Sequence, residues 1–409
     1  MEDTIGMGSS NVVRAQRLAK LPPYLYVEIR KRVREAQARG VDVISLGVGD
    51  PDQPTPQHVI DALARAAADP ANHQYPTGEQ KGMPAFRKAV AGWYERRFGV
   101  RLDPDSEVLA LIGSKEGNHH LALALLDPGD MAIVPDPGYP AYVASAIFAG
   151  AEVVRVPLRH ENGFVLDFAD VPAEVARRAK VIWLSYPNNP TTAVAPLEFW
   201  QRAVDWARAN DVLLVSDNPY SEISFDGLRV PSVLEAHGAR DVAIEFNSLS
   251  KPYNMTGWRV GMAVGNADLI AAIDQVKENT DSGIFNAVQY AGIAALEGPQ
   301  DIVSRNIEIY KRRRDLAVST LRSIGLAVEP PKATFYVWAP VPAGITSIDF
   351  AARLLELTGV VVTPGIGYGS RGEGFVRMSL SVPDARLEEA MGRIRRVRDE
   401  LGAQLAASR

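Results

Sequence analysis

The chain contains no cysteine among its 409 residues, which excludes disulfide bonds, thiolate nucleophiles and thiolate metal ligands. Histidine is also scarce, and of the six histidines only His119 and His120 are adjacent. Adjacent residues of a helix point in different directions, so this pair does not indicate a metal site and none is expected. No apolar run reaches the roughly 18 residues of a membrane span, and residues 1–21 lack the apolar core of a secretory signal.

An excess of basic charge is missing as well. Lysine and arginine number 44 against 49 acidic residues, which gives a formal net charge of −5. A surface that binds nucleic acid concentrates basic side chains, and no segment of this chain does so. We therefore expect no nucleic acid partner, no membrane contact and a soluble cytoplasmic protein.

Short apolar runs alternate with stretches of helical length from about residue 108 onward. They predict strands at residues 108–112, 131–134, 181–184, 212–215, 243–246 and 260–264. Strands separated by helices imply crossover connections, and hence an α/β fold whose mostly parallel sheet is flanked by helices on both faces. Reactive groups in such folds gather at the carboxyl ends of the strands.

The character of the sequence changes after Gly298. A long charged helix is predicted at residues 301–322. Shorter elements follow it, with strands at 333–338, 360–363 and 375–380, a helix around 350–357 and a terminal helix. We predict a large domain of residues 49–299 and a smaller α+β domain of residues 1–48 and 300–409. The basic cluster at residues 311–314 is expected on a solvated helix face.

Residues 247–259 carry the most specific signal, and they read Asn-Ser-Leu-Ser-Lys-Pro-Tyr-Asn-Met-Thr-Gly-Trp-Arg. A lysine that forms an imine with an aldehyde needs a crowded, partly desolvated pocket that lowers its pKa, and Lys251 stands among small hydroxyl residues. Ser248, Ser250 and Arg259 supply the hydroxyl and guanidinium donors that a phosphate monoester requires. The segment therefore indicates a pyridoxal phosphate site in which Lys251 binds the aldehyde.

Two further requirements of such a site are met at other predicted strand ends. Ser114 and Lys115 follow Gly113 at a strand-to-helix turn, where backbone N–H groups and side chains can hold a phosphate. Asp217 closes the strand at 212–215 and is suited to keep a pyridine nitrogen protonated. Such a pair about 4 Å apart gains about 4 kcal/mol at an effective dielectric constant near 20.

The cofactor's ring and the substrate require four more side chains. Asn189 and Tyr220 follow neighbouring predicted strands and can donate to a phenolic oxygen, while Tyr139 begins a predicted helix and can stack on the ring. Arg377 is the only charge in the apolar run 375–380, and its guanidinium suits a carboxylate. Each residue alone has a common structural explanation as a turn, core or ion-pair residue. Their combination favours the site.

With these motifs, the chain resembles the fold-type I, class I/II pyridoxal phosphate-dependent aminotransferases from about Leu21 to the final helix. The resemblance implies a ping-pong transfer of an amino group between an L-amino acid and a 2-oxo acid. It implies that Lys251 binds the cofactor and serves as the catalytic base, and that Asp217 faces the pyridine nitrogen. The other implied roles are Asn189 and Tyr220 at the ring hydroxyl, Tyr139 on the ring face, Ser114, Lys115, Ser248, Ser250 and Arg259 around the phosphate, and Arg377, Gly49 and Asn189 at the substrate.

Two positions bear on assembly and on a departure from the family pattern. Tyr75 matches a tyrosine that reaches the phosphate of the neighbouring subunit, which implies a homodimer with shared active sites. Where the family reads Asn-Pro-Thr-Gly, this chain reads Asn-Pro-Thr-Thr, with Thr192 in place of the glycine. A β-branched residue disfavours positive φ, so the turn after Thr191 is expected to differ while Asn189 keeps its place.

Several segments narrow the resemblance to the LL-diaminopimelate aminotransferases. These are residues 21–25, 112–117, 186–190, 220–223 and 254–259, and residues 281–283 point the same way. The implied reaction pairs LL-diaminopimelate with 2-oxoglutarate, and Lys115 with polar groups of the partner subunit would hold the distal end of the substrate. The alanine–glutamate aminotransferases share much of this sequence, and another specialised biosynthetic aminotransferase stays open, because pocket residues change while the cofactor frame does not.

Other classes of protein fit less well. A lyase or decarboxylase on the same scaffold is not excluded by the cofactor residues. A regulator with an aminotransferase-like domain needs an added DNA-binding domain, for which the residues before Gly47 are too few. A dinucleotide enzyme is disfavoured, because residues 47–49 lack the third glycine of the fingerprint and residues 365–369 have the wrong spacing.

Overall fold

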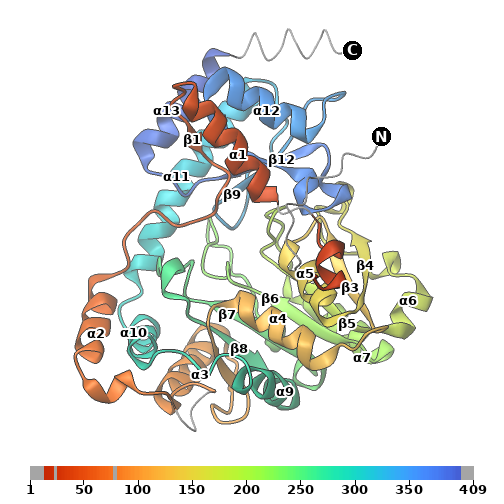
Figure 1. Cartoon of the computed structure of the whole chain (residues 1–409), viewed down its shortest axis with the longest axis vertical. Helices are drawn as coiled ribbons and strands as arrows, with labels where there is room; N and C mark the ends of the chain where they lie inside the picture. The colour runs from red at the N-terminus through yellow and green to blue at the C-terminus, as the bar shows by residue number, and fades with distance from the viewer. Residues whose placement is uncertain (1–12, 23–24, 77–80, 398–409) are drawn as a thin grey trace.

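A central sheet dominates the structure, a computed structural model that describes residues 13–22, 25–76 and 81–397. Among these residues, seven strands form the sheet in the order β2-β8-β7-β6-β5-β3-β4 (Figure 1). The strands are β2 (Val108–Leu111), β3 (Met131–Asp136), β4 (Glu152–Pro157), β5 (Ala179–Leu184), β6 (Leu213–Asp217), β7 (Ala243–Ser248) and β8 (Gly261–Gly265). Neighbours from β4 to β7 are parallel, whereas β8 runs antiparallel to both β7 and β2. The predicted α/β fold with a mostly parallel sheet is confirmed.

One strand of the sheet, β4, was not predicted. It lies at the edge of the sheet beside β3, and most of its residues are partly or fully exposed. An edge strand with an open face carries charged residues such as Glu152 and Arg155 in place of a continuous apolar run. The pattern used to find the buried strands therefore passes over it.

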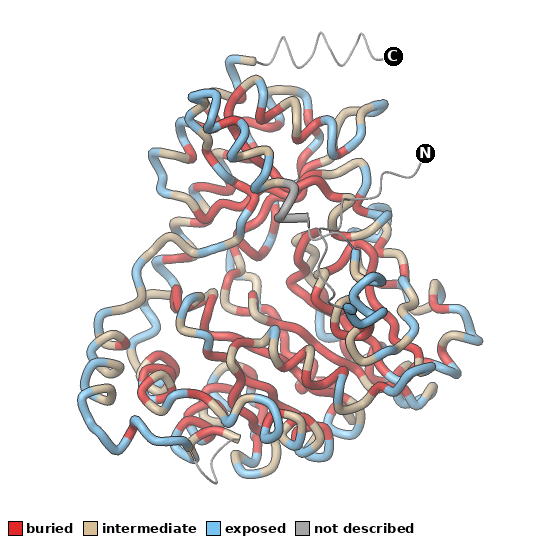
Figure 2. The backbone as a smooth tube through the Cα atoms, viewed as in Figure 1, coloured by how far each residue is buried: buried red, intermediate tan, exposed pale blue. Residues whose placement is uncertain are grey.

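Helices cover both faces of the sheet. On one face lie α4 (Ser114–Leu125), α5 (Pro140–Ala149) and α9 (Ala267–Glu278), and on the other lie α3 (Pro84–Phe98), α7 (Leu197–Asn210) and α10 (Asn286–Glu297). Successive strand residues point to opposite faces. Within β5, Ile182 accordingly packs into the core with α3 and α7, and Trp183 packs into the core with α4 and α5. Figure 2 shows the strands buried between outward-facing helix surfaces.

A smaller body stands above one edge of this sheet (Figure 1). Its strands β9 (Tyr336–Pro340), β11 (Thr363–Pro364) and β12 (Phe375–Ser379) form an antiparallel sheet in the order β11-β12-β9. A parallel pair, β1 (Ile44–Ser45) with β10 (Val360–Val361), ties the N-terminal segment to it. The strand predicted at residues 360–363 is thus two strands, because Val361 pairs with β1 and Thr363 pairs with β12.

Helices α1 (Leu25–Ala38), α11 (Asp301–Ser323), α12 (Ser347–Thr358) and α13 (Asp384–Arg396) surround the strands of the smaller body. The remaining α-helices of the described residues are α2 (Gln57–Ala67), α6 (Ala173–Arg178) and α8 (Ala239–Val242). No described helix has both the length and the apolar character needed to cross a membrane. The domain limits drawn from the sequence stay predictions, and their outer ends, residues 1–12 and 398–409, lie outside the described residues.

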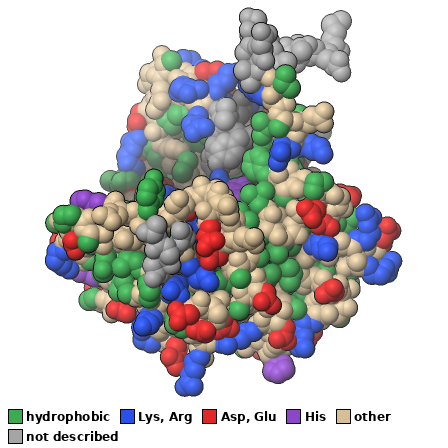
Figure 3. Space-filling view, turned by 60° about the horizontal axis from the view of Figure 1, so that its bottom comes forward, with side chains coloured by type: hydrophobic (Ala, Val, Ile, Leu, Met, Phe, Trp, Pro, Cys, Tyr) green, Lys and Arg blue, Asp and Glu red, His purple; other side chains and the backbone are tan. Residues whose placement is uncertain are grey.

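The expectation that residues 311–314 form a solvated helix face is wrong for two of the four. Arg313 and Arg314 are buried, and Arg313 donates to Asp52 and to Asp384 while Arg314 donates to Asp226. Arg313 therefore links α11 to the segment before α2, which contains Asp52. The spacing of charges in the sequence did not reveal this role. On the face shown in Figure 3, lysine and arginine side chains lie among aspartate and glutamate.

Candidate active site

The predicted site residues meet where the sheet faces the smaller body. Parallel strands β5, β6 and β7 end at this edge, and antiparallel β8 begins there, so that Arg259 before β8 joins residues that follow the other strands. A cavity of about 520 Å³ opens at this edge, a size typical of small-molecule sites. Its lining includes all predicted site residues except Tyr75, namely Gly49, Ser114, Lys115, Tyr139, Asn189, Asp217, Tyr220, Ser248, Ser250, Lys251, Arg259 and Arg377.

Lys251 projects into this cavity. Its Nζ donates to the carbonyl oxygen of Gly49 at 2.9 Å and lies 5.5 Å from the centre of the Phe335 ring. The pKa of Lys251 is lowered to about 8. Burial is the largest cause, the charge of Asp50 opposes it, and the charges of Arg377 and Arg259 add to it. The amine is therefore partly neutral near physiological pH, as a lysine that reacts with an aldehyde must be.

Asp217 ends β6 and is almost completely buried. Its Oδ2 accepts from the hydroxyl of Tyr142 at 2.8 Å and lies 3.5 Å from Nδ2 of Asn118. Its Oδ1 is buried without a hydrogen-bond partner among the described residues. Burial raises the pKa of Asp217 to about 6, and Tyr142 and Asn118 oppose that rise. A buried carboxylate with one oxygen held and the other unpartnered is suited to a protonated ring nitrogen.

Arg377 lies in the middle of β12 and is fully buried. Its Nη1 donates to Oδ1 of Asn189 at 2.6 Å, and its Nη2 donates to the carbonyl oxygen of Gly47 at 2.9 Å. The guanidinium stacks over the Tyr336 ring, 4.0 Å from its centre. These contacts fix the plane of the guanidinium at the cavity, and the fork can then present paired N–H donors to a carboxylate.

Asn189 and Tyr220 complete the side of the cavity next to Asp217. Because Asn189 accepts from Arg377 through its amide oxygen, its amide nitrogen is turned away from Arg377 and can donate to another oxygen. The hydroxyl of Tyr220 lies 3.0 Å from that of Tyr336. Burial and the neighbouring Tyr336 raise the pKa of Tyr220 well above its usual value, so the phenol stays a neutral donor.

The turn from β2 into α4 forms the anion-binding end of the cavity. Ser114 is the first residue of α4, and the first N–H groups of a helix have no partner inside it. Gly113 adopts φ of +75°, and a Cβ built on it would meet Nη2 of Arg259 at 2.0 Å, so only glycine lets the guanidinium approach this turn. Ser248 accepts from the backbone N–H of Ser250 at 3.1 Å.

The turn after Thr191 places a β-branched residue, Thr192, in the left-handed region of backbone conformations. Thr192 adopts φ of +64°, and its N–H donates to the carbonyl oxygen of Asn188 at 2.9 Å. The side chain of Asn188 also accepts from Thr191. Local hydrogen bonds thus hold a β-branched residue in a conformation that it disfavours. Asn189 lines the cavity, and the expected difference from the family's turn stays a prediction.

Three residues that shape the cavity were not predicted. Tyr142 follows Tyr139 at the (i, i+3) spacing and Asn118 follows Ser114 at the (i, i+4) spacing, so each shares a helix face with a predicted residue. Tyr336 lies two residues from the inward-facing Trp338 on β9 and packs against Arg377. Helical periodicity applied to Tyr139 and Ser114 would have found Tyr142 and Asn118, whereas no predicted site residue lies on β9 to indicate Tyr336.

Tyr75 lies outside the cavity of its own chain, and 79% of its surface is exposed. Tyr139 lines the cavity and packs edge-on against Tyr142, with ring centres 5.6 Å apart. Tyr139, Asp217 and Lys251 line the same cavity, so an aromatic ring bound on Tyr139 would share it with a carboxylate and an amine.

Taken together, the donor set fits pyridoxal phosphate. The unpartnered oxygen of Asp217 suits a ring nitrogen, and the amide of Asn189 with the phenol of Tyr220 suits a ring oxygen. The N-terminus of α4 with its neighbouring serines and Arg259 suits a phosphate. Lys251 supplies an amine of lowered pKa for an aldehyde.

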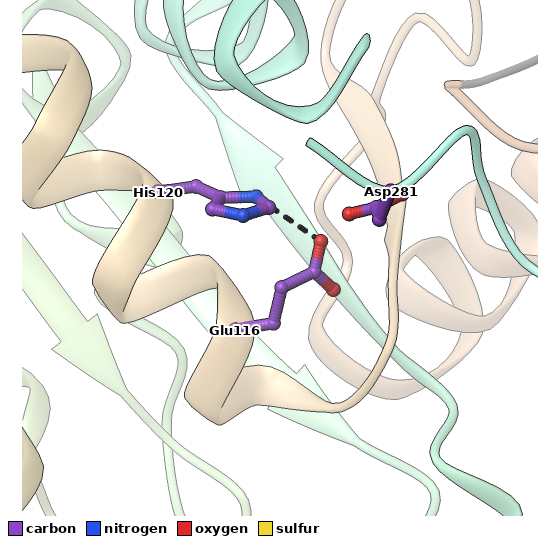
Figure 4. A group of neighbouring side chains, drawn as sticks. All are labelled: Glu116, His120 and Asp281. Atoms are coloured by element: carbon purple, nitrogen blue, oxygen red, sulfur yellow. Dashed lines mark ion pairs between the residues drawn. The ribbon is translucent and has the colours of Figure 1, made fainter. Parts of the chain in front are cut away.

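A group of possible metal ligands lies outside the lining of this cavity. Ligand atoms of Glu116, His120 and Asp281 fall within 4.8 Å of one another (Figure 4). The ammonium group of Lys277 lies 2.8 Å from Oε1 of Glu116 and 2.9 Å from Oδ1 of Asp281. A side-chain cation thus already occupies the position between the two carboxylates.

Comparison with known proteins places the chain among related sequences over nearly its whole length. The family model for aminotransferase class I and II matches residues 41–394. LL-diaminopimelate aminotransferase from Dehalococcoides mccartyi is 56% identical over 380 residues, which are 93% of this chain and 97% of that protein. The enzyme of the same name from Desulforudis audaxviator is 57% identical over 383 residues, 94% of this chain and 97% of that protein. Among solved structures, substrate-bound BacF from Bacillus subtilis has a TM-score of 0.90 at 38% identity, covering 94% of this chain and 98% of that one.

Proposed function

The chain belongs to the class I and II aminotransferases, a family of pyridoxal phosphate-dependent enzymes, and from this premise we propose that it transfers an amino group from LL-diaminopimelate to 2-oxoglutarate. The observation that carries the substrate assignment is the similarity to LL-diaminopimelate aminotransferases. More than half of the aligned residues are identical, over more than nine-tenths of this chain. The cavity supports the reaction class, since it brings together an amine of lowered pKa, a buried carboxylate and a buried guanidinium.

Lys251 has two tasks in the proposed reaction. When bound, pyridoxal phosphate supplies an aldehyde that takes up the amino group and a ring that withdraws electrons from the substrate carbon. Lys251 would hold that aldehyde through Nζ while no substrate is bound. The released Nζ then takes the proton from the substrate α-carbon, which its pKa of about 8 allows near neutral pH.

Asp217 keeps the cofactor ring protonated during this transfer. With a pKa of about 6, its carboxylate is largely ionised at pH 7 to 8, and because Tyr142 binds Oδ2, Oδ1 would be available to the ring nitrogen. A pair about 4 Å apart gains about 4 kcal/mol at an effective dielectric constant near 20. Asn189 and Tyr220 would hold the ring oxygen, Tyr139 would cover the ring face, and the turn at Ser114 would hold the phosphate.

Arg377 orients the amino acid for proton transfer. Its guanidinium takes the α-carboxylate, with Asn189 and the backbone near Gly49 beside it, so that the α-hydrogen points toward Lys251. Lys115 is exposed at the rim of the cavity and contacts the distal end of the substrate. A 2-oxo acid leaves, a second one enters, and the same residues run the steps in reverse, which gives ping-pong kinetics.

A homodimer completes the site in this proposal. Tyr75 is 79% exposed on its own chain, and two large apolar side chains at the start of α10 are also exposed, Phe285 at 47% and Tyr290 at 39%. Such groups are costly to leave in water and are favoured at interfaces. Tyr75 then donates to the phosphate of the partner subunit, and the enzyme works in the cytoplasm.

A half-reaction screen tests the proposed substrate. Purified protein loaded with pyridoxal phosphate is mixed with LL-diaminopimelate, alanine, glutamate or aspartate while the absorbance of the bound aldehyde is followed. We expect LL-diaminopimelate to bleach this absorbance faster than alanine or aspartate, and 2-oxoglutarate to restore it. The Lys251→Ala variant serves as the control and shows no comparable change.

Each alternative gives a different result in the same screen. Bleaching by alanine without bleaching by LL-diaminopimelate would identify an alanine–glutamate enzyme. Protein that is yellow as purified and is bleached by none of the amino acids would overturn the aminotransferase assignment in favour of a lyase.

A further inference from the structure

The backbone of Ile112, directly before the phosphate-binding turn, is held through both its N–H and its carbonyl group. Its N–H donates to the carboxylate of Glu116, which reaches back from the first turn of α4. Its carbonyl oxygen accepts from Nη2 of Arg259 at 3.4 Å. Glu116 thus makes the contact of a helix capping box one residue earlier than usual, and it fixes the entry of the chain into the turn at Gly113 and Ser114.

Glu116 is itself held by a lysine that is completely buried. Lys277 of α9 has no exposed side-chain surface, and its ammonium group lies 2.8 Å from Glu116 and 2.9 Å from Asp281. Nδ1 of His120 lies 3.1 Å from the same oxygen of Glu116 (Figure 4). Burial by itself raises the pKa of Glu116, but His120 and Lys277 outweigh it and lower that pKa to about 2. Glu116 therefore remains a carboxylate.

A carboxylate in this place needs a counter-charge. The phosphate in the proposed function is an anion at the N-terminus of α4, and Glu116 stands in the first turn of the same helix. Two anions at one helix end repel each other, and a buried carboxylate without a partner is costly. Lys277 supplies this positive charge to Glu116. It does not line the cavity, so it acts from the side of Glu116 away from the cavity.

We propose that Lys277 is a positioning residue for cofactor binding, which acts through Glu116 to hold the turn at Ile112–Ser114 in the form that binds the phosphate group. The inference rests on the proposed function, because it takes the phosphate to lie at this turn. It assigns no metal to the group of Glu116, His120 and Asp281, where the ammonium of Lys277 already fills the central position.

The test compares two aldehydes that differ only in the phosphate. Apoprotein is titrated with pyridoxal phosphate and with pyridoxal. The dissociation constant of pyridoxal divided by that of pyridoxal phosphate measures the contribution of the phosphate site. In Lys277→Met we expect this ratio to fall about ten- to hundredfold, the loss expected when a charge-assisted hydrogen bond is broken. Binding of pyridoxal, which lacks the phosphate, should change little, and Lys277→Arg should restore part of the ratio.

Two further variants separate positioning from general loss of structure. Lys81→Met is the matched control, because Lys81 pairs with Asp274 of the same helix α9 at 3.7 Å and does not contact Glu116. It should leave the ratio unchanged. In Glu116→Gln, where no carboxylate needs neutralising, adding Lys277→Met should change the ratio less than it does in the wild type. All titrations are made well below the thermal midpoint of each variant.

The outcomes distinguish the inference from the function on which it rests. If wild-type apoprotein binds pyridoxal phosphate no more tightly than pyridoxal, the proposed phosphate site is wrong. If the wild type strongly prefers pyridoxal phosphate and folded Lys277→Met keeps the full preference, Lys277 has no positioning role and the proposed function stands. Equal weakening of both aldehydes would also overturn the inference, since it would indicate a structural role only.

Discussion

Replacement of Asp217 by asparagine is expected to stabilise the apoprotein while it destroys activity. Asp217 is 4% exposed, its Oδ1 has no hydrogen-bond partner among the described residues, and burial raises its pKa from an ordinary 3.8 to about 6. An acid whose pKa is raised by folding destabilises the fold wherever it is ionised. Asparagine has the same shape, can still accept from the hydroxyl of Tyr142 and carries no charge.

The magnitude follows from the two pKa values. One pKa unit corresponds to about 1.4 kcal/mol, so a rise from 3.8 to about 6 costs the folded apoprotein about 3 kcal/mol at pH 8. The cost is complete above pH 6 and vanishes below the unfolded value of 3.8, and at pH 5 about half of it remains. The stability advantage of Asp217→Asn should therefore be about 3 kcal/mol at pH 8 and shrink as the pH falls.

Urea unfolding of the apoprotein at pH 8 and pH 5 measures this advantage. The exposed Asp205 on α7 provides a matched control, and Asp205→Asn should show no comparable pH-dependent gain. In the holoenzyme the same change removes the charge that keeps the ring protonated, and turnover should fall about a thousandfold, the equivalent of about 4 kcal/mol. An apoprotein that is equally or less stable at pH 8 after the change would refute the reasoning about the buried charge.

Three other substitutions test separate parts of the site. Lys251→Ala should lower turnover by about ten-thousandfold because it removes the base, while equilibrium dialysis still detects bound pyridoxal phosphate; near-native turnover would contradict the assignment. Arg377→Lys should lower kcat/KM about a hundredfold in steady-state assays, because a lysine cannot replace the fork held by Asn189 and Gly47, and an unchanged value would exclude Arg377 as the carboxylate clamp. Thr192→Gly should raise the free energy of unfolding by about 1 kcal/mol without loss of activity, because glycine tolerates a φ of +64° better than threonine does. Urea titrations measure this change, and a destabilised variant would show that the turn is not strained.

Most of the fold was predictable because buried parallel strands leave an unmistakable pattern. The runs at residues 181–184 and 243–246 lie within β5 and β7, and all residues of both runs are buried because helices cover both sides of the sheet. The edge strand β4 escaped, since an open face permits charges such as Arg155. The split between β10 and β11 also escaped, because pairing with two different sheets depends on segments far away in the chain.

The residues that face the cavity were predictable for a chemical reason. A lysine among serines, an aspartate that closes a strand and an arginine alone in an apolar run are each unusual for their surroundings, and twelve of the thirteen predicted positions line one cavity in this chain. The thirteenth, Tyr75, lies outside it, as a residue proposed to serve the partner subunit would. The family and its cofactor followed correctly from the same motifs.

Residues that do not line the cavity were not predictable in the same way, because the sequence around them resembles that of an exposed surface. Lys277 stands in the polar stretch Gln-Val-Lys-Glu-Asn and reads as a surface lysine, yet it is completely buried. Arg313 reads as part of a solvated cluster, yet it is buried between Asp52 and Asp384. In each case at least one partner acid comes from a distant segment, Glu116 for Lys277 and Asp52 for Arg313, so the burial of the charge is decided by tertiary pairing. A buried, fully paired cation is costly to place and costly to remove, and here one such cation stands behind the turn that is proposed to bind the phosphate. The charge at the phosphate-binding turn therefore depends on buried ion pairs, such as that of Lys277 with Glu116, whose lysine does not line the cavity.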